Sequence, residues 1–138
     1  MTLDGIVHWF ETLSRATLSD IGRFYADDAW FKDPFNEVAG VDAIGRVFAH
    51  MFDRLHEPRF RVLERWRGDG DAMLTWEFTF ALRPGGDELR IRGASHLRFA
   101  PDGRIRYHRD YWDAAEELYA KLPVLGMLMR FLQRRARA

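Results

Sequence analysis

The sequence predicts an α+β domain in which helices pack on one face of an antiparallel sheet. Apolar residues recur at helical spacing up to Leu55, and from Phe60 to Phe99 they occupy every second position. Turn signals at residues 68–70, 84–86 and 101–103 separate the alternating segments, which predicts a meander of hairpins. The chain carries no linker or repeat, so residues 1–138 are predicted to form one domain.

The first part of the chain is predicted to be mainly helical. Amphipathic helices are expected over about residues 3–15, 18–25 and 41–55. The tripeptide His56-Glu-Pro58 should end the third helix. Between the second and third helices we expect a short extended segment, because Pro34 biases Asp33 away from the helical region. Residues 36–40 should then form a brief return strand or turn.

Alternating residues predict four strands in the second part of the chain, over about 60–67, 71–82, 89–99 and 104–113. The face expected to point inward comprises Trp76, Phe78, Phe80, Ser95, Leu97 and Phe99. Asp113 and Glu116 have the spacing of a capping box, so a final helix is expected from Asp113 to residue 138, with an interruption at Pro123.

The last predicted strand carries His108, Asp110 and Trp112 at a spacing of two, which places all three on one face. Alternation alone allows the opposite orientation, in which Ile105, Tyr107 and Tyr111 are buried and His108 and Asp110 face water. Trp112 shares the parity of the polar pair and is costly to expose. We therefore expect His108 and Asp110 to point inward.

Composition excludes several classes of function. Basic and acidic residues balance at 21 each, so no net charge attracts the chain to nucleic acid. The absence of cysteine excludes disulfides, thiolate metal sites and cysteine nucleophiles. The first residues lack the pattern of a signal peptide, and no apolar run approaches the ~20 residues that span a bilayer. A cytoplasmic protein is the expectation.

Four short segments, in this order, resemble the nuclear-transport-factor-2-like superfamily, which includes ketosteroid isomerases and SnoaL-like polyketide cyclases. The segments are Tyr25-Ala-Asp-Asp-Ala-Trp-Phe-Lys-Asp-Pro34, Gly40-Val-Asp-Ala-Ile44, Ser95-His-Leu-Arg-Phe99 and Asp102-Gly-Arg-Ile105. The resemblance covers roughly residues 5–113. It implies a cone-shaped fold with a curved sheet, an apolar pocket between the concave face of that sheet and the three N-terminal helices, and a homodimer formed through the sheet.

The resemblance also implies roles for individual residues. Asp33 matches the general base of ketosteroid isomerase, whereas the oxyanion donors of that enzyme fall at Trp9 or Phe10 and at Ser95, so steroid isomerisation is not expected. Cyclase and dehydratase relatives use His and Asp at or near the positions of His108 and Asp110. The catalytic candidates are therefore Asp33, His108 and Asp110. The candidates for ligand contact are Phe10, Phe31, Phe35, Phe48, Trp76, Phe78, Phe80, Ser95, Leu97 and Trp112.

Each polar candidate has a simpler structural interpretation. The Asp33 carboxylate can accept backbone N–H bonds in the turn around Pro34 instead of acting as a base. The other histidines, His8, His50, His56 and His96, are expected to be solvated or to lie in an interface. His108 and Asp110 lack an identifiable third ligand, so neither a metal site nor a cofactor is predicted.

The apolar tail, residues 122–132, precedes Gln-Arg-Arg-Ala-Arg-Ala at the end of the sequence. This pattern is compatible with a helix lying on a membrane surface. We favour a helix that closes over the pocket mouth or packs on a partner, with its arginines stabilised near the helix C-terminus.

The sequence therefore predicts a domain that binds a small apolar molecule. If it is an enzyme, we expect cofactor-independent isomerisation, cyclisation or dehydration, with Asp33 as base and the pair His108–Asp110 as proton relay. The alternative is a non-catalytic module that uses its apolar tail to recruit a partner or a membrane surface.

Overall fold

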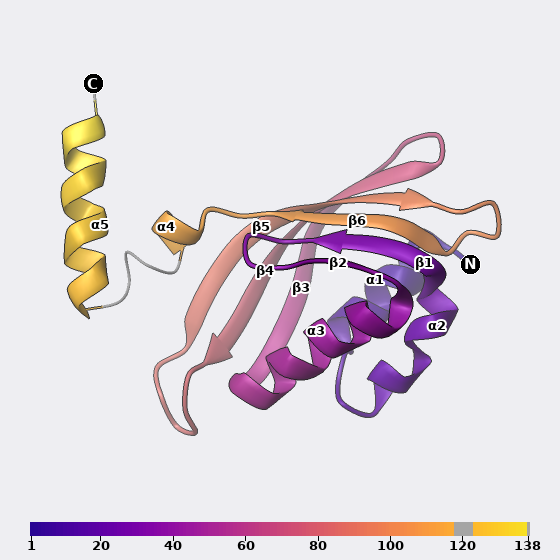
Figure 1. The fold of residues 1–138 in the computed structure, drawn as a ribbon, viewed down its shortest axis with the longest axis horizontal. Coiled ribbons are helices and arrows are strands. Elements are labelled where there is room, and N and C mark those ends of the chain that lie inside the picture. Colours follow the sequence, from indigo (N-terminus) through magenta and orange to yellow (C-terminus); the bar gives the residue numbers. More distant parts are fainter. Residues whose placement is uncertain (118–122, 138) are drawn as a thin grey trace.

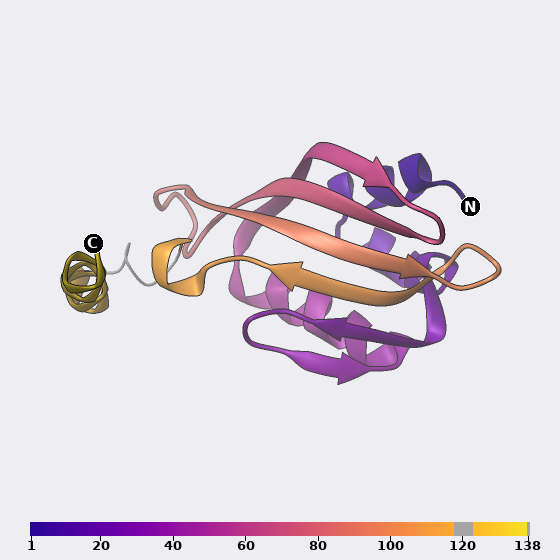
Figure 2. The same cartoon turned by 90° about the horizontal axis from the view of Figure 1, so that it is seen from above.

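The computed structural model describes residues 1–117 and 123–137 and shows helices packed under one curved, open sheet (Figures 1 and 2). The strands are β1 Tyr25–Lys32, β2 Glu37–Ala39, β3 His56–Arg67, β4 Asp71–Ala81, β5 Leu89–Phe99 and β6 Ile105–Tyr111. The helices are α1 Leu3–Glu11, α2 Ile21–Phe24, α3 Val41–Arg54, α4 Ala114–Glu117 and α5 Pro123–Ala136, and a 3-10 turn at Thr17–Asp20 precedes α2. The predicted α+β class and curved sheet are confirmed.

The sheet has the strand order β2-β1-β6-β5-β4-β3, and it is mixed rather than purely antiparallel. Strands β1 and β6 pair in parallel, and every other pair is antiparallel. Helix α3 carries the chain from β2, at one edge, to β3 at the other edge. Three hairpins then bring β6 back beside β1, running in the same direction. The sequence pattern cannot reveal this pairing, because its partners are about 80 positions apart along the chain.

A β-bulge in β6 resolves the two predicted orientations of the last strand. Arg98 pairs with Tyr107 and Phe99 with Ile105, so β6 has one extra residue, Arg106, at this point. The extra residue reverses the parity of the strand. Ile105 and His108 are consequently both buried, although an odd number of positions separates them.

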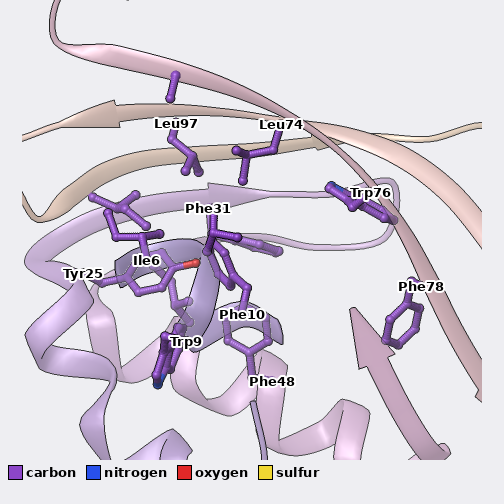
Figure 3. Close-up of a cluster of buried hydrophobic side chains, with 14 of the residues drawn as sticks. Ile6, Trp9, Phe10, Tyr25, Phe31, Phe48, Leu74, Trp76, Phe78 and Leu97 are labelled. Atoms are coloured by element: carbon purple, nitrogen blue, oxygen red, sulfur yellow. The ribbon is translucent and has the colours of Figure 1, made fainter. Parts of the chain in front are cut away.

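Helices α1, α2 and α3 lie beneath the same face of the sheet (Figure 1). Their apolar sides and the inward residues of the strands form one core, in which Tyr25, Phe31, Ile44 and Leu97 are almost completely buried. Figure 3 shows rings from α1, α3 and β1 packed together, with Trp76 and Phe78 facing them from β4. The core therefore lies between the sheet and the helices.

Several boundaries differ from the sequence predictions for local reasons. Helix α1 ends at Glu11, four residues early, because side chains of the next residues bond to the backbone: the Thr12 hydroxyl donates to the His8 carbonyl (2.7 Å) and Thr17 Oγ1 accepts from the Ser14 N–H (2.8 Å). Residues 18–25 form a 3-10 turn and a single α-turn rather than one helix. Strand β3 begins at His56, where a bulged stretch continues the sheet.

The C-terminal region contains two helices. Asp113 caps α4 as predicted, since its carboxylate accepts from the Glu116 N–H (3.1 Å). Residues 118–122 and 138 of the predicted helix 113–138, for which an interruption at Pro123 was expected, lie outside the described residues. Helix α5 begins at Pro123, a residue suited to the first position of a helix. Figures 1 and 2 both show α5 to one side of the sheet, and no described helix is long and apolar enough to cross a bilayer.

A glycine allows Trp76 to lie against the neighbouring strand. Gly93 pairs with Trp76 across β4 and β5, and a Cβ at Gly93 would meet the indole ring at 2.5 Å. No side chain fits at position 93 while the indole keeps this position.

We predict that Gly93→Ala displaces the Trp76 indole and lowers the free energy of unfolding by about 1–3 kcal/mol, the usual cost of overpacking. Urea denaturation measures the loss, and tryptophan fluorescence reports the displacement. Gly22→Ala is the matched control, because a Cβ there meets nothing within 4 Å. Equal stability of the Gly93→Ala protein and the natural one would show that the indole has room to move.

Candidate functional site

His108 and Asp110 both face the interior, in the orientation favoured from the sequence. The His108 side chain lies in the core, with only 4% of the residue exposed. Its Nε2 lies 2.6 Å from Asp110 Oδ1. Because an ionised carboxylate only accepts hydrogen bonds, Nε2 carries a proton and donates it to Asp110.

Tyr25 holds the other side of the His108 ring. Its hydroxyl lies 2.6 Å from His108 Nδ1, and both groups are buried. Burial raises the pKa of Tyr25 well above 10.0, and the negative charge of Asp110 raises this pKa further. Tyr25 therefore keeps its proton. With Nε2–H of the neutral imidazole directed at Asp110, Nδ1 is an acceptor, and the Tyr25 hydroxyl donates to it.

Ser95 and Trp76 complete a continuous chain of hydrogen bonds. The Ser95 hydroxyl donates to Asp110 Oδ1 at 2.5 Å, and it accepts the indole N–H of Trp76 at 2.8 Å. Ser95 was predicted as a ligand-contact residue. In the structure its proton is committed to Asp110, so Ser95 fixes the position of that carboxylate instead.

Aromatic rings enclose the imidazole of His108. Phe31 and Phe10 meet it edge-on, with centroid separations of 4.9 and 5.7 Å, and Tyr25 lies parallel to it at 6.0 Å. Water therefore has little access to His108, and the hydrogen bonds at its two nitrogens define its orientation.

A cavity of about 300 Å³ opens beyond Asp110, between α3 and the sheet. This volume is at the small end of the range for ligand sites, and apolar side chains dominate the walls. Asp110 lines it together with Asp33, while Asn36, His50 and Arg54 supply the remaining polar groups. Both hydrogen bonds accepted by Asp110 end at Oδ1, which leaves Oδ2 available to a ligand.

A second, inner cavity of about 20 Å³ adjoins the first, with room for roughly one water-sized group. His108 and Ser95 line this inner cavity and not the larger one. Asp110 and Trp76 line both, so Asp110 is the acid–base group of the hydrogen-bonded chain that a ligand in the large cavity can reach.

Asp33 lies on the wall of the large cavity and also organises a turn. Its Oδ1 accepts from the backbone N–H groups of Phe35 (2.8 Å) and Asn36 (2.6 Å), as the simpler sequence interpretation proposed. The Asn36 side-chain amide lies 3.1 Å from Oδ1 and 3.2 Å from Oδ2. The turn holds the carboxylate firmly, with Oδ2 the less occupied oxygen.

The predicted ligand-contact residues fall into three groups. Phe31, Phe35, Phe48, Trp76, Phe78, Phe80 and Trp112 line the large cavity. Phe10 and Ser95 line only the inner one, and Leu97 lies in the core beside neither. Phe35, 55% exposed, packs edge-on against Trp112 at the rim, with ring centroids 5.4 Å apart.

Sequence reasoning missed two polar contacts. Tyr25 was predicted to lie on the apolar side of a helix, but it begins β1 and pairs with Ile105 of β6. Trp76 was treated as an apolar wall, and the N–H that it donates to Ser95 was not foreseen. Since both contacts depend on strand pairing, the only sequence signal was that buried Tyr and Trp usually require hydrogen-bond partners.

The remaining histidines lie outside this chain of hydrogen bonds. His8 is exposed on α1, His50 lies at the cavity rim, His56 is exposed at the start of β3, and His96 contacts Asp71 at 3.1 Å. Within residues 1–117 and 123–137, no three His, Asp or Glu side chains converge as a metal site would require.

Residues 6–108 match the family model of the SnoaL-like domain, about three quarters of the chain. The protein belongs to the SnoaL-like domain family. No curated protein matches this SnoaL-like chain significantly.

Solved structures confirm the nuclear-transport-factor-2-like fold of this SnoaL-like domain. A protein with a ketosteroid isomerase-like fold from Catenulispora acidiphila, in complex with trimethylamine, is 15% identical over 89% of this chain and 96% of its own, with a TM-score of 0.76. TerC, co-crystallised with polyporic acid, is 13% identical over 83% and 92%, with a TM-score of 0.70. A SnoaL-like family protein from Agrobacterium tumefaciens is 15% identical over 80% and 92%, with a TM-score of 0.65.

The SnoaL-like domain lacks the donors expected of a ketosteroid isomerase. Trp9 donates its indole N–H to the Thr17 carbonyl (3.1 Å), away from the cavity. Phe10 has no donor, and the Ser95 hydroxyl donates to Asp110.

We predict that Tyr25→Phe lowers the free energy of unfolding by about 1 kcal/mol near pH 8, because His108 Nδ1 loses its donor. Above pH 10 the unfolded chain loses the Tyr25 proton while the folded chain keeps it. The free energy of unfolding of the natural protein therefore falls, through this residue, by up to ~1.4 kcal/mol for each pH unit. The natural protein should therefore lose its advantage over Tyr25→Phe as the pH rises from about 10 to 11. Urea denaturation at several pH values measures the difference.

Tyr111→Phe is the matched control, since that phenol is half-exposed at the end of β6. If the difference between the natural protein and Tyr25→Phe were independent of pH, the raised pKa of Tyr25 would be contradicted.

Proposed function

We propose that this SnoaL-like domain binds a small, largely apolar molecule in the 300 Å³ cavity and catalyses a cofactor-independent proton transfer on it. The observation that carries the proposal is Asp110, a carboxylate held by two hydrogen bonds at the wall of an aromatic cavity. Isomerisation, cyclisation and dehydration all require a group that removes a proton and returns it elsewhere.

The contacts support a specific division of roles. Asp110 Oδ2 takes a proton from a carbon next to a substrate carbonyl, and the resulting acid returns that proton at a second position. His108 and Ser95 donate to Oδ1 and so hold the carboxylate in one orientation throughout the reaction. Tyr25 acts through His108 by fixing its tautomer. His108, Ser95 and Tyr25 are thus positioning residues, and Asp110 is the catalytic one.

Asp33 is the second carboxylate in the cavity and remains a candidate base, the role expected from the family resemblance. Its Oδ1 is occupied by three N–H donors, and Asn36 also approaches Oδ2, so Asp33 has less free acceptor capacity than Asp110. We therefore place the first proton transfer on Asp110. Asp33 then binds a polar group of the substrate or takes a second proton.

The relatives support the class of ligand. The solved complex of TerC contains polyporic acid, and the structure from Catenulispora acidiphila contains trimethylamine. In this chain, aromatic side chains from β1, α3 and β4 line the cavity. The ligand proposed here is accordingly a small molecule with a mainly apolar surface and at least one carbonyl.

We predict that native mass spectrometry of the purified protein detects a bound apolar compound, which organic extraction can recover and which the protein converts to product. Asp110→Asn should retain binding but slow turnover by about 10²–10⁴-fold, the usual contribution of a general base. Conversion by Asp110→Asn at the natural rate would exclude Asp110 as the base. Extraction of no compound, together with no conversion of carbonyl compounds of this size, would favour a non-catalytic module.

Two substitutions at Asp33 separate its possible roles. We predict that Asp33→Asn retains most of the folding stability, because an amide oxygen can still accept the turn N–H bonds, whereas Asp33→Ala loses about 1–3 kcal/mol. If Asp33→Asn slows turnover more than Asp110→Asn does, then Asp33 is the first base. Thermal denaturation and turnover are measured on the same samples.

We also propose that two copies associate through the outer face of the sheet. Met73 and Trp66 are paired across β3 and β4, point away from the core and are exposed, as is Tyr111 on β6. Adjacent large apolar side chains on an open sheet face are typical of an interface between proteins.

We predict a native mass of twice that of the chain, reduced to a single chain in the double variant Trp66→Glu and Met73→Glu. Met127→Glu is the matched control, because it places the same charge on an exposed methionine of α5. A monomeric natural protein, or dissociation caused by Met127→Glu alone, would contradict the proposed interface.

A further inference from the structure

Helix α5 presents an apolar face to solvent. Met127, Leu128, Phe131 and Leu132 are each between 49% and 66% exposed. Positions at this spacing lie on one side of a helix. Figures 1 and 2 show α5 beside the sheet rather than over it, so the described core does not cover this face.

Arginines flank this apolar face. Arg130 lies three positions after Met127, and Arg134 lies three positions after Phe131, so both are neighbours of the apolar side chains along the edge of the face. Arg137 directly follows the end of the helix. Arg135 lies near the apolar face, with its guanidinium carbon 6.0 Å from the centre of the Phe131 ring. Long arginine side chains can cover apolar surface while their charged ends stay in a polar environment.

Charge is divided unevenly between α5 and the rest of the chain. Residues 122–138 contain four arginines and no acidic residue, which leaves 17 basic against 21 acidic residues in the remainder. The chain is neutral as a whole, but its positive excess is confined to the helix that also exposes apolar side chains. An anionic surface would therefore attract α5 and repel the remainder.

The structure disfavours the other occupants considered for this face. A lid over the cavity would bury the four apolar side chains, which are exposed. Pairing of α5 with α5 of a second copy would bring two arginine-rich helices together without a carboxylate on either helix. A lipid surface with anionic headgroups accommodates both the apolar face and the arginines that flank it.

We propose that α5 docks this protein on a membrane surface rich in anionic lipid. With 14 residues at 1.5 Å each, the helix is about 21 Å long, too short for the ~30 Å hydrocarbon core, so it lies along the surface. Met127, Leu128, Phe131 and Leu132 enter the boundary of the acyl chains, and the arginines contact phosphate groups. The cytoplasmic location expected from the sequence places α5 opposite a leaflet that carries such lipid.

Co-sedimentation of the full chain with lipid vesicles tests the proposal. We predict binding to vesicles of phosphatidylcholine with about 30% phosphatidylglycerol, weakening as salt is raised, and little binding to phosphatidylcholine alone. Each arginine near an anionic surface contributes roughly fivefold to partitioning, so the triple variant R134Q, R135Q and R137Q should bind on the order of 100-fold more weakly. The double variant Leu128→Ser and Phe131→Ser should lose about tenfold or more.

The matched control is the triple variant R59Q, R61Q and R83Q, which removes three exposed positive charges outside α5. It should bind the anionic vesicles more strongly than the α5 variants do. The proposal is overturned if the natural protein stays in the supernatant, if both triple variants lose binding equally, or if Leu128→Ser and Phe131→Ser leaves binding unchanged. Dissociation of a native dimer by that double variant would assign the face to a second copy instead.

Discussion

The arrangement of the site depends on a single oxygen atom, Oδ1 of Asp110. A carboxylate placed among aromatic rings is stable only when donors replace the water that it has lost. His108 and Ser95 supply those donors, and each is held in turn by a second group, Tyr25 and Trp76 respectively. The five residues come from β1, β4, β5 and β6, so the chain of hydrogen bonds also fixes these strands relative to one another.

The chain of hydrogen bonds divides the interior into two parts with different properties. On the α1 side, aromatic rings close around His108 and leave only a small inner cavity. On the α3 side, the same sheet diverges from the helix and leaves a cavity large enough for a ligand. Asp110 lines both parts, and the two hydrogen bonds that it accepts both end at Oδ1. An acid–base group in such a position can respond to a substrate without loss of its own support.

Irregular features of the sheet make the site possible. The bulge at Arg106 lets β6 bury both an aliphatic residue near its start and a histidine three positions later. The parallel pairing of β1 with β6 then places Tyr25 beside that histidine. Gly93 leaves room for the Trp76 indole to reach Ser95. In a regular meander without bulge or glycine, the same side chains would not meet.

The sequence by itself determined the class of fold, the hairpin meander, and the apolar, basic character of the final helix; it favoured the inward placement of His108 and Asp110 but left the opposite orientation open. These follow from periodicity, turn residues and local capping, which act over a few neighbouring positions. Only the tertiary structure decided the parallel pair β1–β6, the contact of Tyr25 with His108, the use of the Ser95 proton by Asp110, and the open face of α5. Each of these features is a contact, or the absence of a contact, between segments that are far apart in the sequence. The residue pattern alone does not bring such segments together, because their contacts depend on the strand order and on the shift of register at a bulge.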